Sequence, residues 1–190
     1  MDLMQIPVAP YLSGPTIGLR APSLDDVGSM TAWDDAPLPC TPDVGREMLC
    51  RSEQTPWGNA EHLRLMVIDL QSGDIVGSVM IERQRDRIGK IRIVSAPLLT
   101  AKRRNAIEGD ILDLIVPWMR DELDLMIVVL DLASDRTAVI ARAEALGLTE
   151  VVRLREHIQR PHGRVDLVTL ESINPAWRHV LAKNTGVDHA

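Results

Sequence analysis

Three consecutive cationic side chains, Lys102, Arg103 and Arg104, lie where the sequence predicts the opening of a helix. The preceding run, 90–95, alternates as a half-buried strand does, and a helical pattern is established by Ile107. Backbone N–H groups at a helix start lack intrahelical acceptors, so such a turn can bind an anion. Because a first helical turn ordinarily favours acids, three cations there indicate either an anionic ligand or a solvated loop.

The composition favours a small partner for this loop. Acidic side chains outnumber basic ones by 27 to 21, and the net charge of -6 argues against nucleic-acid binding and against a membrane-surface role. The 190 residues suffice for one domain with a substantial core. We therefore expect a single domain over 1–190, with 1–15 and 178–190 as peripheral tails.

The cysteines and histidines do not indicate a metal site. Cys40 and Cys50 stand in a Pro-containing segment without neighbouring ligands, and the histidines are scattered without ligand spacing. The start of the chain lacks the basic region of a signal peptide, and no segment reaches the roughly 18 unbroken apolar residues of a spanning helix. We expect free thiols, no membrane contact and a cytoplasmic location.

The periodicity predicts strands and helices in mixed order. Ser23 is an N-cap for a first helix that turns Trp33 inward, and a second helix opens with Pro42. Gly73 and Gly89 are available for turns that need a positive φ. The other predicted segments are strands 16–22, 62–70, 75–82, 90–94, 125–130, 151–158 and 165–170, and helices 107–123 and 136–146, the second of which ends with Gly147 as its C-cap.

Several passages, in the right order, resemble one known family. The run 143–157 reads AEALGLTEVVRLREH, and 161–168 reads PHGRVDLV. Near the front, 19–26 reads LRAPSLDD, and 73–77 reads GDIVG. Together these passages are similar to the GNAT acyltransferase superfamily, in particular to its ribosomal-protein N-acetyltransferase branch.

The resemblance implies an α+β fold with a mixed, mostly antiparallel central sheet of about seven strands flanked by about four helices. It also implies acetyl-CoA as co-substrate and acyl transfer to a primary amine, on a protein N-terminus or a small molecule. Related proteins often form dimers, so a homodimer stays open, although the sequence shows no exposed apolar stripe that demands one.

In that family a glycine-rich loop before the long helix binds the pyrophosphate of acetyl-CoA through its backbone. Here Leu99, Lys102 and Arg104 stand where Arg or Gln and two glycines are usual. Charge-assisted contacts from the basic side chains are one substitute for that loop, and a site whose side chains occupy the cofactor's space is the alternative. The expected cofactor-binding residues are Val94, Ala101, Lys102, Arg103, Arg104, Asn105, Ala106 and Arg136.

The resemblance does not identify catalytic residues. The family's usual acid on the strand before the loop corresponds to Lys90, and its usual Tyr and Ser positions correspond to Ala143 and Val139. None of these side chains can serve as the acid or base of acetyl transfer. The catalytic groups are therefore unassigned, and positioning of the two substrates is the remaining source of catalysis.

Two groups of residues are candidates for the acceptor site. Trp33, Asp34 and Asp35 end the first helix, where the family shapes its acceptor pocket and where an acidic pair suits a cationic amine; an exposed loop is the alternative. Glu156 and His157 adjoin on a strand and should face opposite sides. One of them contacts the amine, or both serve only to hold the last hairpin.

These observations leave two functional hypotheses. The first is an acetyl-CoA-dependent N-acetyltransferase. The second is a GNAT-fold binding or regulatory protein whose cofactor site is degenerate and non-catalytic. Nucleic-acid binding through the basic run is disfavoured by the net charge and by an aromatic content of 3%.

Overall fold

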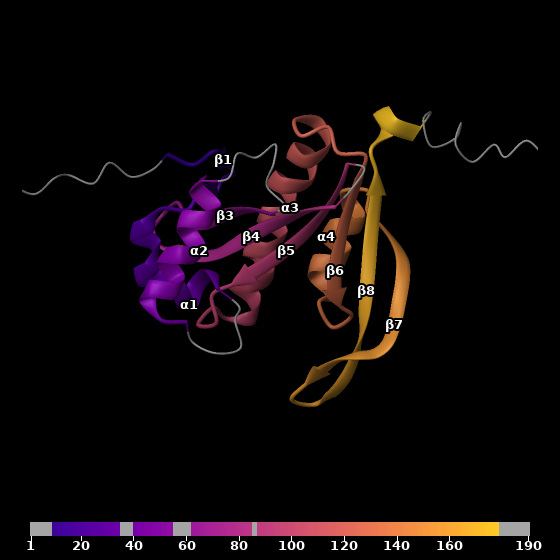
Figure 1. Cartoon of the computed structure of the whole chain (residues 1–190). Coiled ribbons are helices and arrows are strands. Elements are labelled where there is room, and N and C mark those ends of the chain that lie inside the picture. Colours follow the sequence, from indigo (N-terminus) through magenta and orange to yellow (C-terminus); the bar gives the residue numbers. More distant parts are fainter. Residues whose placement is uncertain (1–8, 35–39, 55–61, 85–86, 179–190) are drawn as a thin grey trace, which may run out of the picture. The chain divides into compact units, whose positions relative to one another are not determined.

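A computed structural model describes residues 9–34, 40–54, 62–84 and 87–178 (Figure 1). The Cα positions divide into two compact units, Met1–Met80 with Ile93–Leu114, and Ile81–Arg92 with Ile115–Ala190. Within the described residues, no helix combines the length and the apolar character that crossing a membrane requires. The elements are β1 (Leu12–Ser13), β2 (Ile17–Arg20), η1 (Leu24–Ser29), α1 (Met30–Trp33), α2 (Pro42–Gln54), β3 (His62–Asp69), β4 (Ile75–Gln84), β5 (Ile88–Ser95), α3 (Ala101–Asp121), β6 (Ile127–Ala133), α4 (Thr137–Ala145), β7 (Thr149–Arg160), β8 (Gly163–Ile173) and η3 (Pro175–Trp177).

The strands form one sheet in the order β1-β2-β3-β4-β5-β6-β8-β7. β5 and β6 are parallel because α3 connects them as a crossover, whereas β6 with β8 and β7 with β8 are antiparallel. The predicted mixed, mostly antiparallel α+β fold is confirmed. The sheet has eight strands instead of seven because the two-residue β1 adds to its edge.

In the first unit, a buried ion pair sets the direction of the chain after β2. Arg20 donates to both carboxylate oxygens of Asp26, at 2.6 and 2.8 Å, and Asp26 also accepts the backbone N–H of Ser23 at 2.7 Å. Ser23 completes a capping box, as its position in the sequence predicts. The helical turn that follows is 3₁₀ and passes into α1, which carries Trp33 into a core with Leu49 and Met66.

Two predicted boundaries are corrected. The long helix begins at Ala101 instead of Ile107, so the basic run lies in its first turns and not in a loop. The turn after β4 does not use Gly89: Arg87 has the positive φ, +64°, and Gly89 is a buried strand residue. A Cβ on Gly89 would lie 2.5 Å from a terminal methyl group of Leu125, so a larger residue there would have to displace that side chain.

In the second unit, apolar side chains fill the face of the sheet that carries the buried residues of β6 and β8. Val128, Leu130, Val168 and Leu170 alternate with half-buried neighbours along their strands. α4 ends as predicted, with Gly147 at a φ of +88°. The apolar run 125–130 is not covered evenly, because Val128 and Leu130 are buried whereas Ile127 and Val129 are half-buried.

The last hairpin contains an irregularity that the sequence pattern does not show. The pairing of β7 with β8 shifts between Leu154 and Ile158, and Glu156 has a φ of +48°. Simple alternation therefore fails here, and the regular strand that the prediction for Glu156 and His157 assumed is not observed.

We expect Gly77→Ala to lower the free energy of unfolding by about 2 kcal/mol or more, since an added Cβ would overlap the backbone carbonyl of Val94 on the neighbouring strand. Gly28→Ala is the matched control, because a Cβ at Gly28 meets nothing within 4 Å. Urea denaturation of both variants checks this. Equal stabilities for the two variants would contradict the close approach of β4 and β5 at this point.

Candidate functional site

A tight turn leads from β5 into the N-terminus of α3. Leu99 N–H donates to Ala96 O at 3.2 Å, and Thr100 Oγ1 accepts the N–H of Arg103 at 3.3 Å as an N-cap does. The amides of Ala101 and Lys102, ahead of the first intrahelical bond, are directed out of the helix end. The predicted anion site is therefore the start of a capped helix of 21 residues.

The missing glycines do not strain this turn. Positive φ values occur among the described residues at Arg87, Asp124, Glu156 and three glycines, and all of these lie outside 97–106. The residues at 101–106 are helical, a conformation open to any side chain. The resemblance led us to expect a loop that needs glycine, and the earlier start of α3 removes that need.

The three cations of the basic run differ in their surroundings. Lys102 is exposed. Arg103 donates through Nη2 to Asp69 Oδ2 at 2.6 Å, which joins α3 to the end of β3. Arg104 lies back over the turn, with Nη2 3.4 Å from the carbonyl oxygens of Pro97 and Leu99. Of the three, only Lys102 is exposed.

Asp69 is held as a carboxylate by two donors. The backbone N–H of Gln71 donates to Asp69 Oδ1 at 2.9 Å, and this contact, followed by the one from Arg103, lowers the pKa of Asp69 below its ordinary value. Asp69 and Arg103 also line a hollow of about 280 Å³, together with Pro15, Thr16, Leu70 and Gln71. Arg103 thus has a structural partner that the sequence did not reveal.

A hydrogen bond that the sequence analysis missed joins the two sides of the turn. Ser95, the last residue of β5, donates through Oγ to Glu108 Oε1 at 2.7 Å, and Glu108 is only 3% exposed. Its signal in the sequence is a single acid on the apolar face of α3, between the buried Ile107 and Ile111. An acid in that setting needs a polar partner nearby.

The remaining predicted cofactor residues lie around the same turn or in the second unit. Ala101 and Ala106 are exposed, and Val94 and Asn105 are half-buried. Arg136 belongs to the second unit, where it is the residue before α4 and its backbone carbonyl accepts the N–H of Val139. The structure therefore brings the residues of 94–106 together within the first unit.

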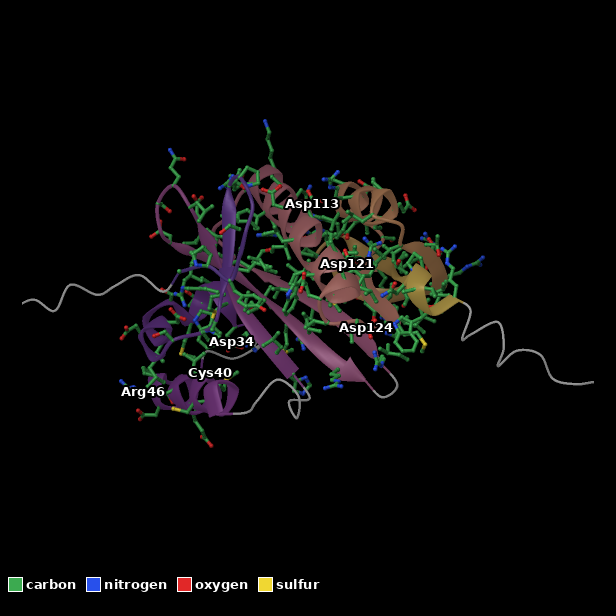
Figure 2. The ribbon with its side chains drawn as sticks, turned by 90° about the horizontal axis from the view of Figure 1, so that it is seen from above. Asp34, Cys40, Arg46, Asp113, Asp121 and Asp124 are labelled. Carbon is green, nitrogen blue, oxygen red and sulfur yellow. The ribbon has the colours of Figure 1, made fainter. Side chains whose placement is uncertain are left out.

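The acceptor candidates of the first unit lie in different surroundings. Trp33 is fully buried, and its indole N–H donates to Asp26 O at 2.8 Å, so the ring packs in the core. Asp34 is half-buried and lies beside Cys40 (Figure 2). A hydrogen bond with Asp34 raises the pKa of the Cys40 thiol, which keeps that thiol protonated and unreactive. Asp35 lies outside the described residues.

In the second unit, the position of the family's usual acid is occupied by an ion pair. Lys90 Nζ lies 2.7 Å from Asp131 Oδ2 on the neighbouring strand, and Thr169 Oγ1 donates to Asp131 Oδ1 at 2.7 Å. Val139 and Ala143 are fully buried in α4. These positions carry a neutralised charge and two core side chains, which agrees with the absence of an assigned acid or base.

Glu156 and His157 are both exposed, and their backbone is held by side chains of β8. Asp166 Oδ1 accepts the N–H of Glu156 at 3.0 Å, and Arg164 donates to the carbonyl oxygens of Glu156 and His157. Asp166 also pairs with Arg153, and these bonds lower the pKa of Asp166 below its usual range, the backbone contact first. Asp166 therefore stabilises the irregular backbone of the hairpin.

The described residues contain no group of three or more His, Cys, Asp or Glu side chains arranged to hold a metal ion. The candidate site of the first unit consists of the capped helix start, the exposed Lys102 and the Ser95–Glu108 hydrogen bond.

We expect Asp69→Asn to lower the free energy of unfolding at pH 7 by about 1 kcal/mol, because Arg103 loses a charged partner. The pKa of Asp69 is lower in the folded state than in the unfolded chain, so the Asp69 carboxylate stabilises the fold at pH values above the unfolded-state pKa. This stabilisation is lost as the pH falls through the folded-state pKa. Urea denaturation should show the difference from the parent protein shrinking below about pH 4.

Asp43→Asn is the control for this prediction, because the Asp43–Arg46 pair is exposed and should contribute little. A pH-independent effect of Asp69→Asn, or an equal effect of Asp43→Asn, would show that the contact with Arg103 does not stabilise the start of α3.

Solved structures resemble this chain over most of its length. A protein from Sphaerobacter thermophilus DSM 20745, classed as an acetyltransferase, is 33% identical, with a TM-score of 0.67 over 87% of this chain and 98% of its own. A dodecameric spermidine N-acetyltransferase from Vibrio cholerae is 16% identical, with a TM-score of 0.66 over 88% and 99%. A protein from Vibrio cholerae classed as a ribosomal-protein-serine acetyltransferase is 12% identical, with a TM-score of 0.62 over 86% and 97%.

No family profile matches the sequence, and no curated protein matches it either. The two Vibrio cholerae structures share the fold, while the Sphaerobacter protein is similar in sequence as well as in structure. At that identity, over nearly the whole of both chains, the protein described here belongs to the GNAT family of acetyltransferases.

Proposed function

We propose that this protein is an acetyl-CoA-dependent N-acetyltransferase that transfers an acyl group to a primary amine of a protein N-terminus or a small molecule. The observation that carries the proposal is the capped start of α3, where the amides of Ala101 and Lys102 point out of the helix beneath an exposed ammonium group. Helix amides together with a cation suit the diphosphate of a coenzyme.

The residues at this turn fit such a diphosphate, but through contacts that differ from those of the family's glycine-rich loop. Close backbone approach, which glycine would allow, is replaced by a regular helix start whose conformation needs no glycine. The Lys102 ammonium supplies a point charge at the opening. The buried Nε–H of Arg104 has no acceptor among the described residues, so this side chain still has a donor to offer at the turn.

Acetyl-CoA supplies the acyl group as a thioester, and the chain's own residues must orient it and admit a neutral amine. Lys90 is already paired with Asp131, so this side chain does not act as a free base at the position of the family's usual acid. Orientation alone contributes about 7 kcal/mol in favourable cases, which is enough for a slow enzyme acting on an already deprotonated amine.

We propose an amine as the acceptor, which both the family and Asp34 support. Asp34 is a carboxylate at the end of α1, and its attraction for a cationic amine supports a polyamine or an N-terminus as substrate. The spermidine N-acetyltransferase of Vibrio cholerae is a structural neighbour with an amine substrate. A cytoplasmic location agrees with this chemistry and is part of the proposal.

A second candidate function is a GNAT-fold binding protein without catalytic activity. One observation favours it: the Arg104 guanidinium lies against the carbonyl oxygens of Pro97 and Leu99, in contact with the turn itself. If that side chain stays in place, the turn has less room for a diphosphate.

We expect isothermal titration to detect acetyl-CoA binding to the protein, and Lys102→Glu to weaken it roughly tenfold, or about 1.4 kcal/mol, because a charged contact is replaced by repulsion. Lys102 is a cleaner probe than Arg103, whose replacement by Glu would also place a second carboxylate beside Asp69. Release of free coenzyme A thiol with spermidine, and with an N-terminal peptide, then identifies the acceptor class.

Arg46→Glu is the matched control, since Arg46 lies on α2 with an exposed side chain and its replacement changes the net charge equally (Figure 2). If millimolar acetyl-CoA produced no heat of binding and no thermal shift, the enzyme proposal would lose its basis. Binding without thiol release, with either amine, would favour the non-catalytic alternative.

A further inference from the structure

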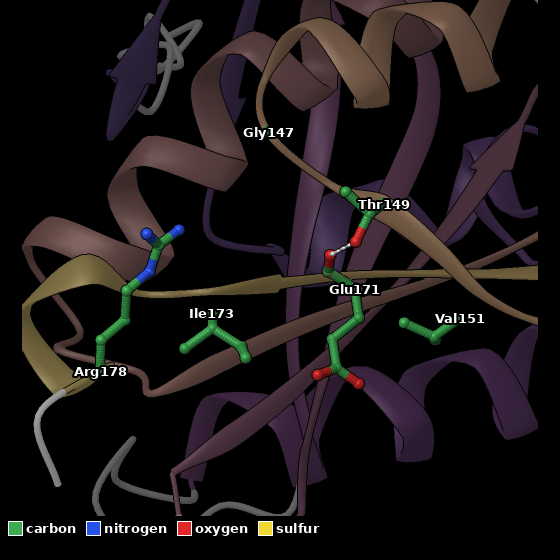
Figure 3. A pocket seen from close by; sticks show the side chains of 6 residues that line it. All are labelled: Gly147, Thr149, Val151, Glu171, Ile173 and Arg178. Carbon is green, nitrogen blue, oxygen red and sulfur yellow. Dashed lines mark hydrogen bonds between the residues drawn. The ribbon is translucent and has the colours of Figure 1, made fainter. Parts of the chain in front are cut away.

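A hollow of about 340 Å³ lies in the second unit, where β7 begins and β8 ends. The residues that line it are Gly147, Thr149, Val151, Glu171, Ile173 and Arg178 (Figure 3). A hollow of this volume can hold a small molecule. None of its residues belongs to the cofactor or acceptor candidates described above, so the hollow has no assigned role.

Two opposite charges line this hollow without pairing with each other. Glu171 is half-buried and Arg178 is exposed. Among the residues that the structure describes, neither side chain forms an ion pair or a hydrogen bond. Thr149 Oγ1 donates to the backbone carbonyl of Glu171 at 3.4 Å, which leaves the carboxylate available. A ligand with one positive and one negative group would therefore satisfy both charges.

Apolar side chains lie between and beside the two charges. Figure 3 shows Ile173 between Glu171 and Arg178, and Val151 on the other side of Glu171. Ile173 is 37% exposed and Val151 is 51% exposed. A ligand that reaches from one charge to the other passes over Ile173, so an aliphatic connection between its charged groups would be favoured by burial.

The backbone keeps the hollow open on the side of α4 and β7. Gly147 has a φ of +88°, and a Cβ at this residue would meet nothing within 4 Å, so no side chain fills the space after α4. The pairing of β7 with β8 shifts between Glu150 and Val152, which makes Val151 the extra residue of a bulge. A bulge bends its strand locally, and this one lies at the rim of the hollow.

The residues after β8 hold Arg178 at the other end. Asn174 is 6% exposed and donates through Nδ2 to the carbonyl oxygens of Arg120 and Leu125, at 2.9 and 3.1 Å. These bonds anchor the start of η3, and the backbone N–H of Arg178 donates to Pro175 O at its end. The backbone that carries Arg178 is thus fixed before any ligand binds, which lowers the entropic cost of binding.

We infer that this hollow binds a small zwitterion whose ammonium group and carboxylate are joined by a short aliphatic chain. The ammonium group pairs with the Glu171 carboxylate, the ligand's carboxylate accepts N–H groups of Arg178, and the chain covers Ile173. Two residues along a strand span about 7 Å, so a ligand that passes over Ile173 needs several bonds between its charges. Linear ω-amino acids have this form, whereas the charges of glycine are too close together.

The two charges argue against other classes of ligand. A phosphate or nucleotide would be repelled by Glu171, and a polyamine would be repelled by Arg178. Either ligand would also leave one of the two charges without a partner. The inference does not depend on the proposed activity, because binding is measured without acetyl-CoA.

The first test compares probes on the parent protein by isothermal titration. The full chain should bind δ-aminovalerate, and pentylamine and valerate should each bind at least fivefold more weakly, because each lacks one of the two charged contacts. Glycine should also bind more weakly than δ-aminovalerate. If pentylamine or valerate bound as tightly as the zwitterion, the proposed pair of contacts would be excluded.

The second test changes the two charged residues. Glu171→Gln and Arg178→Gln should each weaken the binding of δ-aminovalerate at least fivefold. Glu144→Gln on α4 and Arg46→Gln on α2 are matched controls, since both residues are exposed and lie outside the lining of the hollow. Circular dichroism spectra and melting curves show whether the variants are folded.

Exchanging the two charges separates ligand binding from a structural role. Glu171→Arg alone should abolish binding of δ-aminovalerate, because two cations then line the hollow. The double variant Glu171→Arg with Arg178→Glu should bind it again, with the ligand reversed end to end. A double variant that binds no better than Glu171→Arg alone would contradict the proposal.

Nuclear magnetic resonance of the isotope-labelled parent protein gives a measurement that needs no variant. Addition of δ-aminovalerate should shift the amide signals of Gly147, Thr149 and Ile173, which line the hollow, and leave those of α2 unchanged. Unchanged amide signals at millimolar δ-aminovalerate, or shifts confined to other parts of the chain, would overturn the inference.

Discussion

The hydrogen bond from Ser95 to the buried carboxylate of Glu108 holds the candidate site together. Ser95 ends β5 and Glu108 lies in the second turn of α3, so the bond spans the turn that joins them. A buried carboxylate is costly unless donors satisfy it, so the strand end and the helix must keep this spacing in the folded state. The turn is thereby shaped from its two ends, which explains how it dispenses with glycines inside it.

The three cations of the basic run are accommodated in different ways. Three adjacent cations at a helix start would repel one another and the positive end of the helix dipole. The structure relieves this repulsion by pairing Arg103 with Asp69 and by placing Arg104 against two carbonyl oxygens. Only Lys102 is left exposed at the opening, so the electrostatic attraction for an anion depends on one side chain and the helix amides.

Local signals in the sequence predicted the parts of the fold that local chemistry determines. The cap at Ser23, proline at the start of α2 and glycine after α4 each satisfy a backbone requirement within a few residues, and all three are observed. The Asp69–Arg103 and Ser95–Glu108 contacts join residues 34 and 13 positions apart, and no periodicity records such pairings. The bulges of β7 were missed because strand patterns assume strict alternation.

Several charged side chains of the basic run and of β5 have partners in the structure. In the first unit, Arg103 and Arg104 both have acceptors, and in the second unit Lys90 is neutralised by Asp131, which Thr169 also contacts. A charge left buried without a partner would be costly to the fold whatever the function of the protein. These contacts therefore stabilise the local fold around the turn and around Lys90.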